Sequence, residues 1–149
     1  MKNRIFYILL LIYLSCLTGL HVNSSEQFNF NVTEIEILNN GNIIKGSKKG
    51  SVKTNDGVTI KANTFIYDKS SNVLTANGNV EILDYNKNLK IYSDNAVYQK
   101  NDEILTTNQN SKAIYETGKF IFADNFKFSR NENILNAKGD VKIEDTENG

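Results

Sequence analysis

Residues Ile60–Ile82 read IKANTFIYDKSSNVLTANGNVEI, and variants of this stretch recur along the chain. The segment 62–67 (ANTFIY) aligns with 93–98 (SDNAVY) 31 residues later and with 123–128 (ADNFKF) after a further 30. In each copy a polar break with a cation, an aliphatic pair and a small or polar patch follow in the same order. A fixed period of this length predicts a repeat protein, in which each unit buries its apolar face by stacking on its neighbours.

Two other parts of the chain carry weaker copies of the pattern. Ile35 and Ile37 precede Phe65 and Tyr67 by 30 residues, and the register then shifts near Lys48-Lys49. The second full copy has Gln109 where the first has a glycine, and Ser111 where the first has a valine. The last copy ends at Gly149 in a turn, which suggests either a ragged final edge or the front part of a longer protein.

Alternation of apolar and polar residues, together with many Val, Ile, Thr, Tyr and Phe residues, predicts an all-β fold of antiparallel hairpins. Asp56-Gly57 is the clearest tight turn, since this pair tolerates the positive φ that hairpin turns need. No segment shows the 3.6-residue apolar period of a helix. We expect strands at Val32–Leu38, Ile43–Gly46, Gly50–Thr54, Val58–Tyr67, Val73–Leu83, Leu89–Tyr98, Ile104–Ala113, Lys119–Phe128 and Ile134–Ile143.

The apolar parity changes within each unit, from even at Ile60 to odd at Phe65 and Tyr67. A bulge at Asn63-Thr64 would return both halves to one face, because an extra residue resets the alternation. With no helix to cover it, the apolar face must be covered by the sheet itself, as in a sandwich, jelly roll or solenoid. The predicted interior comprises Ile60, Phe65, Tyr67, Leu74, Val80, Ile91, Tyr92, Tyr98, Leu105, Phe122, Phe126, Phe128, Leu135, Val141 and Ile143. Each of these side chains could equally belong to an ordinary hydrophobic core that binds no ligand.

The N-terminus has the order of a secretory signal peptide: Lys2 and Arg4, an apolar run from Ile5 to Leu14, then small polar residues. We expect residues 1–24 to be removed and residues 25–149 to form one domain. An uncleaved anchor is an alternative, although the apolar run is short for a membrane span. A lipid anchor on Cys16 is another, but Tyr13 is unusual in such a motif.

Composition narrows the function classes. The only His, Cys and Met residues (His21, Cys16, Met1) fall in the predicted signal segment, and the chain has no Trp or Pro. Cys–His and Ser–His relays, soft metal ligands and disulfides are therefore not expected in residues 25–149. The 17 basic and 17 acidic side chains balance, without a basic stripe for nucleic acid. We expect no catalytic residue, cofactor or metal.

The unit carried by Ala62–Ile82 resembles the repeat of the OstA/LptA-like lipopolysaccharide-transport family, and the likeness extends over about 35–145. This resemblance implies an open, V-shaped β-jelly roll in the periplasm whose apolar trough holds the acyl chains of lipopolysaccharide. It also implies edge-to-edge coupling to other OstA-like proteins by β-strand addition. The trough residues would be Ile60, Phe65, Tyr67, Leu74, Val80, Ile91, Tyr98, Leu105, Phe122, Phe126, Phe128 and Leu135, and the coupling edges would contain Ile35, Ile37, Val141 and Ile143.

Within that family the chain fits best the N-terminal periplasmic domain of an LptD-like protein, whose outer-membrane barrel would follow. A soluble LptA-like bridge protein is the next choice and a membrane-anchored LptC-like protein the third. Two other functions remain open. One is a structural or adhesive β-solenoid of the envelope. The other is a polysaccharide-cleaving enzyme that would use Asp94 and Asp124, which occupy equivalent turns.

Overall fold

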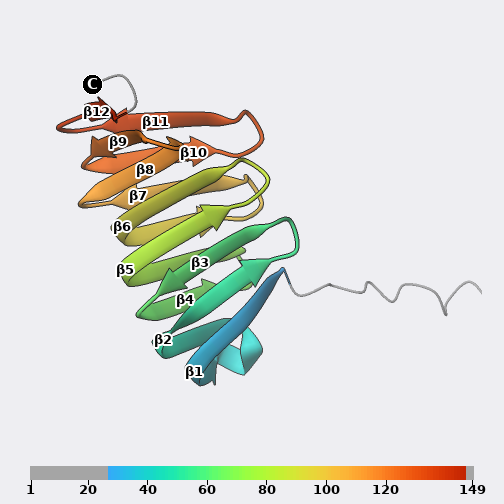
Figure 1. The fold of residues 1–149 in the computed structure, drawn as a ribbon. Coiled ribbons are helices and arrows are strands. Elements are labelled where there is room, and N and C mark those ends of the chain that lie inside the picture. Colours follow the sequence, from blue (N-terminus) through green and yellow to red (C-terminus); the bar gives the residue numbers. More distant parts are fainter. Residues whose placement is uncertain (1–26, 147–149) are drawn as a thin grey trace, which may run out of the picture.

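The computed structural model describes residues 27–146, so the predicted signal segment lies outside the described part. These residues form an almost purely antiparallel β structure, drawn in Figure 1. The strands are β1 (Phe28–Leu38), β2 (Ile43–Thr54), β3 (Val58–Ala62), β4 (Thr64–Asp68), β5 (Val73–Asp84), β6 (Leu89–Gln99), β7 (Ile104–Asn108), β8 (Ser111–Glu116), β9 (Lys119–Ala123), β10 (Asn125–Ser129), β11 (Ile134–Lys138) and β12 (Lys142–Asp145). One 3₁₀ turn, η1 (Asn39–Gly41), joins β1 to β2. No helix within 27–146 is long and apolar enough to cross a membrane.

The strands form two layers that share one bent side. The first layer contains 28–32, 50–62, 80–93, 111–123 and 142–145. The second layer contains 34–46, 64–77, 95–108 and 125–138. Strands β1, β2, β5 and β6 pass from one layer to the other, and the remaining strands are separate halves. Figure 1 shows the strands stacked as successive rungs, with β1 and β11–β12 at opposite ends. The fold is thus a β-jelly roll, as the sequence predicts.

The bent side, which we call the hinge, is made by pairs of residues with positive φ. The pairs are Lys48-Lys49 (61° and 66°), Gly78-Asn79 (78° and 52°), Gln109-Asn110 (69° and 50°) and Gly139-Asp140 (79° and 40°). They recur with the sequence period, so every unit bends at the same point. Opposite each later pair lies an unpaired residue, Asn63, Asp94 or Asp124, which donates its backbone N–H back to this bend. Asn63 and Asp124 each separate two strands, whereas Asp94 lies within β6. The predicted bulge at Asn63 is therefore the point where the chain changes layer.

The second unit keeps the bend although it lacks the glycine. Gln109 adopts the left-handed conformation that Gly78 and Gly139 adopt in the other units. Ser111, which replaces a valine, is buried, and its hydroxyl lies 2.8 Å from the Thr107 hydroxyl and 3.2 Å from that of Ser93. The polar substitution is satisfied by hydrogen bonds, so the unit retains its geometry.

The predicted strands lie where expected, but their division at the hinge differs. Ile43–Gly46 and Gly50–Thr54 join into one strand, β2, and the first strand begins at Phe28 instead of Val32. The predicted strands Val58–Tyr67, Ile104–Ala113, Lys119–Phe128 and Ile134–Ile143 are each two strands. The reason is the hinge, where a change of direction interrupts the ladder of hydrogen bonds.

Replacing Gly78 by alanine should destabilise the protein by about 1–3 kcal/mol, because a non-glycine residue is strained in this conformation. The added Cβ would also lie 2.5 Å from Nδ2 of Asn63 across the hinge. Urea unfolding of the purified variant measures the loss. Gly41→Ala is the control, because Gly41 has a similar φ of 91°, but within residues 27–146 no atom beyond its chain neighbours lies within 4 Å of the position that an added Cβ would take. If the two variants lose equal stability, crowding at the hinge contributes nothing.

Candidate functional site

The side chains that face each other between the layers form long apolar rows. Pairing register defines one row in each layer. Across the second layer it runs through Ile37, Ile44, Tyr67, Leu74, Tyr98, Leu105, Phe128 and Leu135. Across the first layer it runs through Phe30, Val52, Ile60, Ile82, Ile91, Ala113, Ile121 and Ile143. An apolar lining therefore extends from the first strand to the last.

The middle of this interior is filled by its own side chains. Tyr98 has 0% of its surface exposed, and Leu74 and Ile91 have 1%. The rows become accessible only toward the ends of the stack. A cavity of about 530 Å³ at the β1 end includes Phe28, Phe30, Ile35, Ile37, Ile44 and Tyr67 in its lining. A cavity of about 250 Å³ near the other end is lined by Lys87, Leu89, Tyr115, Ile121, Phe128, Asn133 and Leu135.

Most of the predicted trough residues do lie in the interior. Ile60, Phe65, Tyr67, Leu74, Val80, Ile91, Tyr98, Leu105, Phe126 and Phe128 are buried in one cluster, and Leu135 packs against it. Burial among protein side chains fits a core as well as a closed binding site, so contact with lipid stays a proposal.

Phe122 and Tyr92 lie on the outer face, so their predicted inward orientation is wrong. The neighbour of Phe122, Ile121, packs against the core, and successive side chains of a strand point to opposite faces. The Phe122 ring instead lies beside Lys112, whose Nζ is 5.2 Å from the ring centre. Tyr92 is next to Lys112 in the same outer row, and Lys90 Nζ lies 4.7 Å from its ring. Both aromatic rings thus stabilise lysines on the surface.

The predicted coupling residues lie at the two ends of the stack. Ile35 and Ile37 belong to β1, and Ile143 belongs to β12. Among residues 27–146, β1 pairs only with β2, and β12 pairs only with β9. Val141 precedes β12 and is also exposed, so its predicted place in the interior is wrong. Ile37 and Ile143 end the apolar rows and are 62% and 65% exposed. Each end of the described stack therefore presents a strand with one unpaired edge, together with apolar side chains from the inner face, which is an arrangement suited to strand addition.

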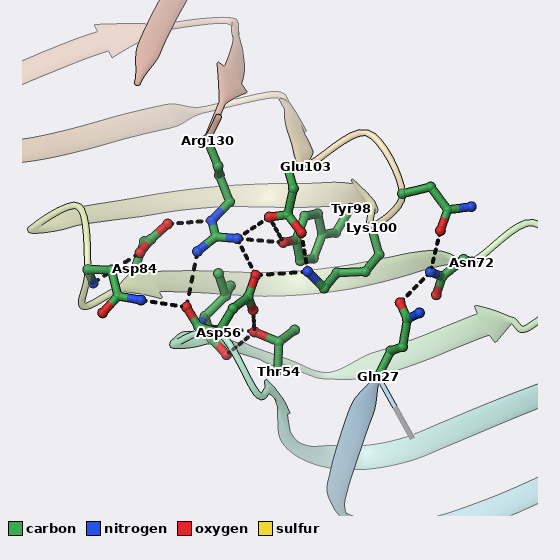
Figure 2. A network of polar contacts seen from close by, with 12 residues as sticks. Gln27, Thr54, Asp56, Asn72, Asp84, Tyr98, Lys100, Glu103 and Arg130 are labelled. Carbon is green, nitrogen blue, oxygen red and sulfur yellow. Dashed lines mark hydrogen bonds and ion pairs between the residues drawn. The ribbon is translucent and has the colours of Figure 1, made fainter. Parts of the chain in front are cut away.

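The side opposite the hinge, which we call the mouth, is bridged by charged side chains (Figure 2). Arg130 follows β10 in the second layer. Its Nε donates to Asp84 of the first layer at 2.6 Å, and its Nη1 donates to Asp56 at 2.6 Å. Lys100 of the second layer also donates to Asp56, at 2.8 Å. We call the set Asp56, Asp84, Tyr98, Lys100, Glu103 and Arg130 the polar clasp.

Within its own layer, Arg130 is held by two more groups. Its Nη1 donates to the Tyr98 hydroxyl at 2.9 Å and to Glu103, which also accepts bonds from Tyr98 and Lys100. Two cations thus meet three carboxylates, and the Arg130 side chain is only 6% exposed. The Tyr98 ring lies in the core and its hydroxyl in the clasp, so the clasp is directly continuous with the apolar interior.

Two opposing effects set the pKa values of the clasp residues: burial and pairing with opposite charges. Burial favours the neutral forms of Asp56, Lys100 and Arg130, but their mutual hydrogen bonds outweigh it. The pKa of Asp56 is therefore lowered, and the pKa values of Lys100 and Arg130 are raised. Burial and the bond to Glu103 both raise the pKa of Tyr98, so its hydroxyl stays a donor. At neutral pH the carboxylate of Asp56 thus faces two charged partners across the mouth.

A second, uncharged link crosses the mouth near β1. Asn72 Nδ2 donates to Gln27 and, at 2.7 Å, to Asn101 Oδ1, while the Tyr67 hydroxyl donates to Asn72 Oδ1 at 2.9 Å. Figure 2 shows this link beside the clasp. Of the residues in these links, the sequence predicted only Tyr67 and Tyr98, and it predicted them as trough residues. The cation in every polar break was a signal for the others, since Lys69, Lys100 and Arg130 occupy equivalent positions.

No protein-family model matches the chain, and no curated protein matches it. The fold is, however, similar to that of a solved structure. It is similar to LptH from Pseudomonas aeruginosa, described as the LptA homologous periplasmic component of the conserved lipopolysaccharide transport device. The TM-score is 0.70 at 15% identity, over 78% of this chain and 92% of that chain. An identity this low establishes the fold alone, and the chain therefore has the β-jelly-roll fold of an LptA-like protein.

Proposed function

We propose that this chain is a non-catalytic carrier in the periplasm that helps to transport lipopolysaccharide toward the outer membrane. Acyl chains would occupy the interior between the layers, and neighbouring OstA-like proteins would continue the path through the end strands. The partners are thus lipopolysaccharide and strand-coupled proteins of the same fold. A location in the periplasm agrees with the predicted signal segment and with the description of the similar structure.

The proposal rests on two features that occur together. Each end strand of the described stack has one unpaired edge, and the apolar rows run the full length of the stack. Ile37 and Ile143 end these rows and remain exposed. A second molecule placed against either end would cover these side chains and lengthen the apolar lining. A protein that only needed a core would gain nothing from exposing the ends of that core to water.

A structural β-solenoid of the envelope is the second candidate, and the filled interior favours it. Side chains such as Leu74 and Ile91 leave no open trough in the middle of the stack. Under the carrier proposal the layers must separate to admit a lipid. Under the structural alternative they never separate, and the interior stays inaccessible to any added ligand.

Photo-crosslinking distinguishes the two candidates. A benzophenone amino acid at Ile121, which lines the cavity near the last strands, should capture lipopolysaccharide in cells and in a purified mixture. The matched control is the adjacent position, Phe122, where the same group would project from the outer face beside Lys112. We expect labelling at position 121 that exceeds labelling at position 122 by at least about tenfold, because adjacent residues of a strand face opposite sides. Equal labelling, or none at either position, would favour the structural solenoid.

A further inference from the structure

The two sides of the jelly roll are held together by different kinds of bond. At the hinge the chain itself passes between the layers. At the mouth, the backbone hydrogen bonds found within 27–146 join turns of the same layer only. Tyr85 N–H donates to Gly57 C=O within the first layer, and Arg130 N–H donates to Glu103 C=O within the second. The bonds that cross the mouth are made by side chains, chiefly those of Arg130 and Lys100 to Asp56 and Asp84.

Side-chain ion pairs can open and close without loss of the sheets. Separating the layers at the mouth would break the bonds from Arg130 and Lys100 to Asp84 and Asp56 and the bond from Asn72 to Gln27, but no strand pairing. The released charges would regain water, and this hydration offsets much of the lost attraction, because burying ions carries a large desolvation cost. The Tyr98 ring, immediately behind the clasp, would then be the first apolar surface to become accessible.

We propose that the polar clasp is a gate that controls lateral access of apolar chains to the interior. The inference rests on the proposed function, since it identifies where an acyl chain enters. In the closed state Arg130 holds the tips of both layers together over the filled interior. When the clasp opens, the layers separate about the hinge and a chain can slide between them from the side. The open cavities at the ends of the stack do not need this step.

The first test removes the charges of Arg130 and Asp84 and leaves the Lys100–Asp56 pair across the mouth in place. The double variant Asp84→Asn/Arg130→Gln keeps side chains of similar size and avoids an unpaired buried charge, which alone would destabilise the protein. The probe is N-phenyl-1-naphthylamine, an apolar dye that fluoresces in apolar surroundings. Loss of a close charge pair speeds the separation of the surfaces that it joins. We therefore expect the variant to take up the dye about tenfold faster than the unmodified protein.

The matched control neutralises an ion pair on the outer face. Lys61 Nζ lies 3.5 Å from Glu81 Oε1, away from the mouth. The variant Lys61→Gln/Glu81→Gln should take up the dye at the unmodified rate. An equal rise in both double variants would show a general loosening and overturn the gate.

The second test locks the mouth and does not depend on how well the first variant folds. Cysteines replace Asp56 and Lys100, and they are the only thiols in residues 25–149 because Cys16 lies outside that range. A short bismaleimide joins them; in the control, both are capped with N-ethylmaleimide. The tethered protein should lose lateral uptake of dye and the lipopolysaccharide crosslink from a benzophenone amino acid at Leu105, which lies in the filled middle of the stack, whereas the capped protein should keep both.

The outcomes separate the gate from the proposed function. If the tethered protein still captures lipopolysaccharide as well as the capped protein does, lateral gating is wrong and the carrier function stands. If dye uptake depends on the clasp but lipopolysaccharide is never captured, the gate stands and the carrier function fails.

Discussion

Alanine in place of Phe65 is expected to lower the free energy of unfolding by about 3–5 kcal/mol, as other large-to-small changes in protein cores do. Phe65 is 1% exposed and lies in the inner row between Gly46 and Ala76, its partners on β2 and β5. Phe30 meets its ring edge-on at 6.4 Å. Because a glycine and an alanine flank the ring, no neighbouring side chain in its row is large enough to fill the space that it would leave.

Urea denaturation of the purified protein measures this loss. The adjacent Ile66 provides the control, since it lies on the outer face of the same strand and is 41% exposed. Ile66→Ala should lower the free energy of unfolding by less than about 1 kcal/mol, the range of strand preferences at exposed positions. A loss at Ile66 equal to that at Phe65 would contradict the assignment of the two faces.

The repeat and the apolar alternation predicted the strands and most of the interior, because both are local properties of the sequence. The prediction failed at Phe122 because the repeat offset was not applied to this residue. A residue 61 positions after Ile60 is Ile121, and the same offset places Phe122 at the position of Lys61, which is exposed. The period therefore already indicated that Phe122 faces outward. Its aromatic character suggested the core, but in the structure the ring contacts a lysine.

The hinge was only partly predictable. Gly78 and Gly139 mark the bend in two units, but Gln109 and Lys48 adopt the same left-handed conformation without a glycine. Such residues are rarely found there, and local preference alone would not select them. Strand pairing on both sides of the bend imposes the left-handed conformation. The repeat register therefore predicts the position of the bend better than residue type does.

The clasp could not be predicted, because its partners are far apart in the sequence. Arg130 bonds to Asp84, 46 residues earlier, and to Asp56, 74 residues earlier. Asp56 and Arg130 lie in turns and Asp84 is the last residue of β5, and polar residues are expected at such positions whether or not they meet. Only the pairing order of the strands shows which turn of one layer faces which turn of the other.

Aspartate in place of Ile37 or Ile143 should strongly weaken head-to-tail association of the protein. In a continued stack, β1 of one molecule would lie antiparallel to β11 and β12 of the next, as neighbouring strands do throughout the fold. Ile37 would then lie in the same row as Leu135 of the next molecule, and Phe30 in the same row as Ile143. Covering one isoleucine contributes about 1.5–3 kcal/mol, and a buried unpaired carboxylate costs more. Each variant should therefore weaken association at least about 100-fold.

Light scattering coupled to size-exclusion chromatography, over a range of concentrations, measures the association. Tyr85→Asp is the matched control: Tyr85 is 69% exposed, about as much as either isoleucine, but lies in a turn away from both end strands. It should associate like the unmodified protein. Because the two ends are different surfaces, each end variant keeps one intact end. Mixing Ile37→Asp with Ile143→Asp should therefore produce a capped dimer, through the intact β11–β12 end of the first and the intact β1 end of the second. If instead one of the two variants associates by itself, the molecules join through like ends, and a continuous apolar path through the stack is excluded.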